Sequence, residues 1–92
     1  MSSPLAALLR GYLHQDYDLR YASVEDALRA FREESTPHER RRVIAEIDTL
    51  LAAHSDDAAL YAALRERGFV FYPPREGATT AAWLQRAKAL LR

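Results

Sequence analysis

The sequence predicts an all-α protein, a small bundle of about five short helices with one extended segment. Three observations support this fold class. Apolar residues recur at the 3.6-residue spacing of a helix along most of the chain. A capping residue stands before each of these runs. The one β-prone run, residues 69–72, has no second strand-like run to pair with. With 92 residues, we expect residues 1–92 to form a single domain.

The first two predicted helices begin at serines. Ser3 supplies the cap of the first helix, and Pro4 suits its first turn. Ser23 caps the second, with Asp26 at the matching position of a capping box. Their apolar faces are Leu5, Leu8, Leu9, Tyr12 and Leu13 in the first, and Val24, Ala27, Leu28 and Phe31 in the second.

The third predicted helix carries the clearest signals. Thr36 is its cap, Pro37 its first residue, and Glu39 completes a Thr-x-x-Glu capping box. The helical spacing then continues for three turns, which places Ile47 in the core. Its apolar face is Val43, Ile44, Ile47, Leu50, Leu51 and His54.

Two further helices complete the predicted bundle. The run 55–57 caps the fourth and places acids in its first turn, and Gly68 suits the position after its end. The extended segment 69–72 follows and is stopped by two prolines. The last helix begins after Thr79 or Thr80, with Trp83 and Leu84 on its inner face.

Composition limits the possible functions. Thirteen basic residues balance thirteen acidic ones, so the chain lacks the net positive charge of a nucleic-acid binder. Without cysteine, disulfides, thiolate zinc sites and cysteine nucleophiles are excluded. No apolar run reaches the ~20 residues that span a bilayer, and the start of the chain shows no signal-peptide pattern. We expect a cytoplasmic protein that binds neither nucleic acid nor membrane.

No catalytic apparatus is visible in the sequence. His38-Glu39 begins a zinc-protease pattern, but Arg42 occupies the second ligand position. His54 suits the cationic end of a helix better than a buried base. His14, Asp16 and Asp18 alternate in a way that could hold a divalent ion, and a small metal-dependent hydrolase is one alternative on this basis. We predict no catalytic residue, no metal and no cofactor.

The order of motifs resembles a known family. The run Tyr12 to Tyr17, YLHQDY, is similar to the Y-[FL]-H-Q-D-[WY] segment of immunity proteins from bacterial contact-dependent growth inhibition systems. Further matches follow in the same order over nearly the whole chain. They are the E-[ED]-A helix at 25–27, the E-I-D-x-L-L helix at 46–51, the aromatic-Pro segment at 71–74, and W-L at 83–84.

This resemblance implies a function and a partner. Such a protein binds the C-terminal toxin domain of a delivered effector, commonly a nuclease, and neutralises it stoichiometrically in the bacterial cytosol. It acts by binding and has no catalytic residues. The alternative from another class is a small helical DNA-binding regulator, which rests on the three arginines 40–42.

The predicted toxin-binding surface is the loop after the first helix together with the start of the second. Carboxylates next to tyrosines suit a protein interface, because charges steer encounter and rings provide contact area. Tyr72, in the segment 72–76, is a further candidate. His14 and Asp16 have an equally good structural interpretation as turn residues. The predicted partner-binding residues are Asp16, Tyr17, Asp18, Tyr21, Glu25, Asp26 and Tyr72.

Overall fold

The computed structural model describes residues 3–13, 21, 23–69 and 79–92, and these residues form five helices without any strand. The predicted all-α fold class is confirmed. The predicted extended segment from Val70 to Tyr72 lies outside the described residues. The helices are α1 Pro4–Tyr12, α2 Val24–Glu34, α3 Pro37–Ala53, α4 Asp57–Glu66 and α5 Thr80–Leu91.

Side-chain caps set the starts of the helices, as the sequence predicts. Ser3, Ser23 and Thr79 each accept a hydrogen bond from the backbone N–H three residues later. Thr36 and Glu39 form the complete capping box of α3. Within the run 55–57, the capping residue of α4 is Asp56. Gly68 takes the left-handed conformation after α4, with φ of 100°.

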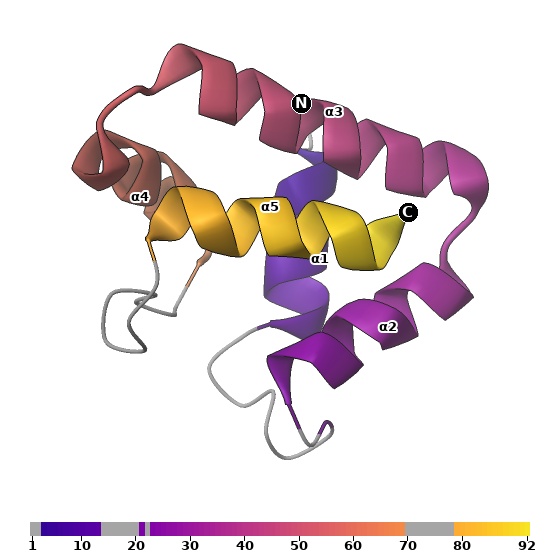
Figure 1. The fold of residues 1–92 in the computed structure, drawn as a ribbon. Coiled ribbons are helices and arrows are strands. Elements are labelled where there is room, and N and C mark those ends of the chain that lie inside the picture. Colours follow the sequence, from indigo (N-terminus) through magenta and orange to yellow (C-terminus); the bar gives the residue numbers. More distant parts are fainter. Residues whose placement is uncertain (1–2, 14–20, 22, 70–78) are drawn as a thin grey trace.

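The helices pack around α5 and α1 (Figure 1). α5 contacts α2, α3 and α4, whereas α1 contacts α2 and α3. α2 runs beside the second half of α5 in the same direction, since Glu25 near the start of α2 pairs with Arg86 and Arg32 near its end donates to the Arg92 carbonyl. α3 runs in the opposite direction along α5, and Lys88 pairs with Asp48 at 2.5 Å between them.

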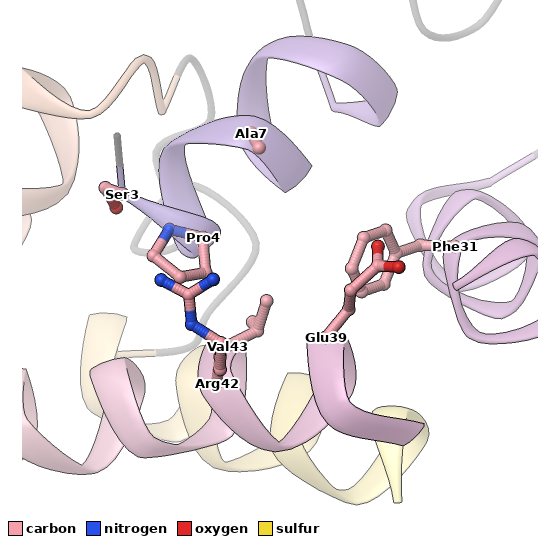
Figure 2. Close-up of a pocket in the computed structure, with 7 residues that line it drawn as sticks. All are labelled: Ser3, Pro4, Ala7, Phe31, Glu39, Arg42 and Val43. Carbon is pink, nitrogen blue, oxygen red and sulfur yellow. The ribbon is translucent and has the colours of Figure 1, made fainter. Parts of the chain in front are cut away.

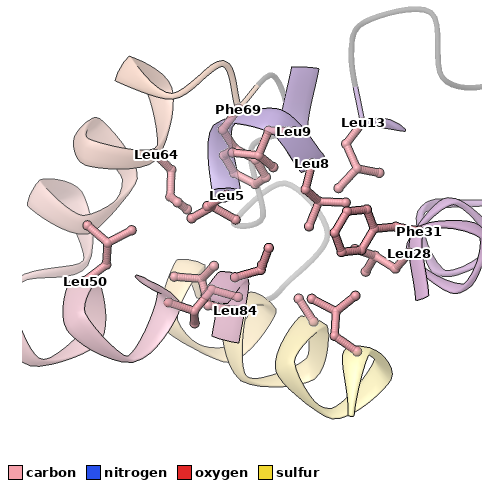
Figure 3. Packing of buried hydrophobic residues seen from close by; sticks show 14 of the residues in the cluster. Leu5, Leu8, Leu9, Leu13, Leu28, Phe31, Leu50, Leu64, Phe69 and Leu84 are labelled. Carbon is pink, nitrogen blue, oxygen red and sulfur yellow. The ribbon is translucent and has the colours of Figure 1, made fainter. Parts of the chain in front are cut away.

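A single apolar cluster fills the interior (Figure 3). All five helices contribute to it, and Ile47 is fully buried as predicted. Trp83, also predicted in the core, is only partly buried and lies at the edge of the cluster. Its ring packs on that of Phe69 with 4.8 Å between the ring centroids. The buried apolar residues are Leu5, Leu8, Leu9, Leu13, Ala27, Leu28, Phe31, Val43, Ile47, Leu50, Leu60, Leu64, Phe69, Leu84, Ala87 and Leu91.

Glu46 joins three helices beside this core. Its carboxylate accepts hydrogen bonds from the Ser3 hydroxyl at 2.5 Å and the Leu5 N–H at 2.9 Å, at the start of α1. Arg67, after the end of α4, donates to it at 2.7 Å. Burial raises the pKa of Glu46, but these three donors outweigh burial and hold the pKa below its ordinary value.

Asp57 links α4 to α5 in a similar way. Its two carboxylate oxygens accept from the backbone N–H groups of Thr80 and Ala81, at 3.0 and 3.1 Å. The hydrogen bond from the Thr80 N–H, together with that from the Ala81 N–H, outweighs the effect of burial, which raises the pKa. The pKa of Asp57 is therefore lowered. The first turn of α5 therefore has a second cap besides Thr79, supplied by a residue 23 positions earlier in the chain. None of the five helices in the described ranges is long and apolar enough to cross a membrane.

Candidate partner-binding surface

Three of the predicted partner-binding residues lie in the described part of the chain: Tyr21, Glu25 and Asp26. The other four, Asp16, Tyr17, Asp18 and Tyr72, lie outside the described residues. His14, the remaining member of the candidate metal triplet, lies outside them as well. The geometry of the candidate surface is therefore built on the start of α2.

The two acids at the start of α2 both have cationic neighbours. The Ser23 cap fixes the first turn, and Glu25 and Asp26 stand in it, where acids favour the helix dipole. Asp26 pairs with Arg29 of the same helix at 3.1 Å. Glu25 pairs with Arg86 of α5, also at 3.1 Å. The surface at this edge therefore carries both charges, whereas the sequence analysis predicted only carboxylates next to tyrosines there.

Tyr21 packs against the body of the protein. Its ring is stacked on that of Tyr12, with 6.1 Å between centroids. Tyr12 in turn meets Phe31 edge to face at 5.4 Å and donates from its hydroxyl to Glu34 at 2.5 Å. The ring of Tyr21 thus packs against α1 and is partly buried there.

The arginines at 40–42 have separate roles. One guanidinium nitrogen of Arg40 donates to the carbonyls of Arg32 and Ser35, at 2.7 and 2.8 Å. Arg40 therefore caps the end of α2, where two acids oppose the helix dipole. Arg41 and Arg42 are exposed and face two different pockets. Because one of the three arginines is engaged inside the fold and the other two diverge, they do not form the continuous basic face of a DNA-reading helix.

Two pockets open beside the start of α3. The first has a volume of about 180 Å³ and lies between α1, α2 and α3. Its lining includes Glu39 and Arg42, whose side chains extend from α3 on the side of Pro4 and Phe31 (Figure 2). The second has a volume of about 240 Å³ and lies between α3 and the end of α5. No group of three or more metal-ligating side chains occurs among the residues that the structure describes.

Sequence reasoning missed the residues that hold the helices together. The sequence places Glu46 in a family motif, Arg40 in a run of three arginines and Asp57 among the first-turn acids of α4, and none of these patterns indicates a contact between helices. Their partners lie 5 to 43 positions away in the chain, so helical periodicity could not identify them. The available signal for Glu46 was its place at the head of the E-I-D-x-L-L motif, 46–51.

Comparison with known proteins places this fold in a family. The family model described as CdiI immunity protein matches residues 3–91. A chain in the crystal structure of a CdiA-CT/CdiI complex from Y. kristensenii 33638 is similar over 97% of this chain and 96% of its own length, with 30% identity and a TM-score of 0.89. No curated protein sequence matches significantly. Because the family model spans nearly every residue, the chain belongs to the CdiI immunity protein family.

Proposed function

We propose that this protein binds and neutralises the C-terminal toxin domain of a CdiA-type effector, and that the toxin is a nuclease. The observation that carries the proposal is the similar chain at TM-score 0.89, which comes from a CdiA-CT/CdiI complex. The match covers almost the full length of both chains, so a shared mode of action is the simplest account. On this proposal the protein acts in the cytoplasm, stoichiometrically and without catalysis.

The proposed contact surface is the start of α2 with the preceding loop, including Asp16, Tyr17 and Asp18. A nuclease presents a basic face to its nucleic-acid substrate, and carboxylates complement that face and accelerate association. Glu25 and Asp26 support this role, because both side chains remain partly accessible despite their arginine neighbours. Tyr72 is proposed as a further contact.

The test uses the purified protein and a catalytically inactive form of the toxin domain encoded next to it. The variant Glu25→Gln/Asp26→Asn removes two charges at the proposed surface. Its matched control, Glu33→Gln/Glu66→Gln, removes two exposed charges elsewhere. Melting temperatures are compared first, since acids in a first turn stabilise a helix by about 0.3–1 kcal/mol each.

We expect the unsubstituted protein to bind the toxin domain and to protect cells that express the active toxin. The variant at Glu25 and Asp26 should associate more slowly and with a weaker salt dependence than the control variant. Failure of the unsubstituted protein to bind would refute the proposed function. Equal association of both variants would refute the proposed surface only.

A further inference from the structure

The pocket between α3 and the end of α5 combines an apolar floor with a basic rim. It is lined by Pro37, Arg40, Arg41, Ile44, Leu91 and Arg92. The four α3 residues follow the spacing i, i+3, i+4, i+7, so they share one helix face. Leu91 is fully buried, Ile44 is half-buried and Pro37 is exposed, and these three residues are the apolar part of the lining, which we call the floor. We call these six residues the arginine pocket.

Contacts with α2 fix one side of the arginine pocket. Arg40 is held by the carbonyls of Arg32 and Ser35 at the end of α2. Arg32 donates to the carbonyl of Arg92 at 2.7 Å and so holds that residue beside the pocket. Arg41 and Arg92 are exposed, and neither forms an ion pair with a described residue. No acidic side chain lines the pocket, so the charged side chains around it are all positive.

The chemistry of the pocket selects its occupant. A guanidinium binds a carboxylate through two parallel hydrogen bonds, and Arg41 and Arg92 are accessible for such pairing. The apolar floor favours an apolar side chain between them, which a phosphate backbone does not supply. The pocket has a volume of about 240 Å³ and is open to solvent, so an apolar side chain would lie against its surface and not inside a closed cavity.

We propose that the arginine pocket is a second contact point for the toxin polypeptide, and that it binds an acidic segment carrying one large apolar side chain. This inference rests on the proposed function. Glu25, near the start of α2, pairs with Arg86 in the middle of α5, whereas Arg92 at the end of α5 lies beside Arg32 near the end of α2. The acidic contact and the arginine pocket therefore lie toward opposite ends of α2. Opposite charges at two separated points fix the orientation of a partner and reject toxins with a different charge pattern.

The experiment measures affinity for the inactive toxin domain encoded next to this protein. Arg41→Gln/Arg92→Gln removes the rim charges without disturbing Arg40. Arg42→Gln is its control, because Arg42 is an exposed arginine one position away that lines the other pocket. Ile44→Ser tests the floor, and Leu51→Ser is its control, two turns further along α3 and also half-buried.

We expect Arg41→Gln/Arg92→Gln and Ile44→Ser each to weaken binding about tenfold or more, the size of effect that follows from losing a close charge pair or an apolar anchor. Arg42→Gln and Leu51→Ser should stay within about twofold of the unsubstituted protein. Toxin binding that none of these changes affects would overturn the inference and leave the proposed function intact. Absence of binding by the unsubstituted protein would overturn both.

Two further readouts separate other occupants. If a single-stranded or duplex oligonucleotide binds the unsubstituted protein and Arg41→Gln/Arg92→Gln abolishes that binding, the pocket takes phosphates and the inference is wrong. If sedimentation shows a dimer that the same variant dissociates, the occupant is a second copy of this chain and the inference is again wrong. We expect neither result, because the apolar lining at Pro37 and Ile44 gives phosphates no partner, and the inference assigns the pocket to the toxin and not to a second copy.

Discussion

The carboxylate of Glu25 lies 3.1 Å from the guanidinium of Arg86, and this ion pair joins α2 to α5. The side chain of Glu25 is 32% exposed and that of Arg86 is 67% exposed, so the pair lies at the surface. Surface pairs of this kind contribute about 0–1 kcal/mol to stability. Their larger effect here concerns binding, since Arg86 partly neutralises a carboxylate that we propose to meet a basic toxin.

The first prediction follows from this pair. Arg86→Gln should leave the melting temperature nearly unchanged and should accelerate association with the basic face of the toxin, because Glu25 loses its internal cation. Stopped-flow association at low and moderate salt measures the effect. Arg42→Gln removes the same charge without breaking an ion pair, so an equal acceleration in that control would mean that only net charge matters.

The second prediction concerns Glu46. Glu46→Gln removes the charge that binds Ser3, Leu5 and Arg67, and it should lower the free energy of unfolding by about 1.5–3 kcal/mol, the usual range for hydrogen bonds to charged groups. Urea denaturation followed by circular dichroism measures the loss. Glu66→Gln, at an exposed position of α4, should unfold within about 0.5 kcal/mol of the unsubstituted protein. If both variants have the same free energy of unfolding, the contacts of Glu46 with the other helices do not stabilise the fold.

The third prediction is a dependence of stability on acid pH. The folded state lowers the pKa values of Glu46 and Asp57, so both carboxylates bind protons more weakly when the chain is folded. Their contribution is therefore present at neutral pH and is lost as the pH falls below about 4. Urea midpoints between pH 7 and pH 3 measure the loss. The double variant Glu46→Gln/Asp57→Asn should show a flatter profile, and an identical profile would contradict the assignment.

The fourth prediction compares two glycines. Gly11 is helical with nothing within 4 Å of an added Cβ, so Gly11→Ala should stabilise the protein by about 0.5–1 kcal/mol. At Gly68, with φ of +100°, an added Cβ would lie 2.8 Å from Cγ of Arg10. Gly68→Ala should therefore destabilise by about 1–2 kcal/mol. Thermal unfolding measures both changes in stability, which should have opposite signs.

The Arg10→Ala background separates the two causes at Gly68. Removing the Arg10 side chain relieves the contact but not the backbone strain, so Gly68→Ala should remain destabilising there. A fully neutral Gly68→Ala in that background would assign the whole effect to crowding. Stabilisation by Gly68→Ala in the unsubstituted protein would contradict the left-handed conformation after α4.

The sequence alone predicted the helices and their starts, because the signals for them are local. A cap such as Thr36 acts on the residue three positions later, and the periodicity that buries Ile47 acts within one helix. The order of short motifs also indicated the family that the comparisons show. The predicted binding residues on the loop and at Tyr72 remain predictions, since they lie outside the described residues.

The tertiary structure determines which charged side chains form contacts between helices and which remain accessible at the surface. Glu46 reaches a serine 43 positions earlier, and Glu25 meets an arginine of α5, contacts that exist only once the helices have packed. The same packing brings Arg41 of α3 next to Arg92 at the end of the chain and leaves an apolar floor between them. The spacing of apolar residues in the sequence specifies which side of each helix is buried. Which residues of different helices come into contact depends on how the side chains of all the helices pack in the core.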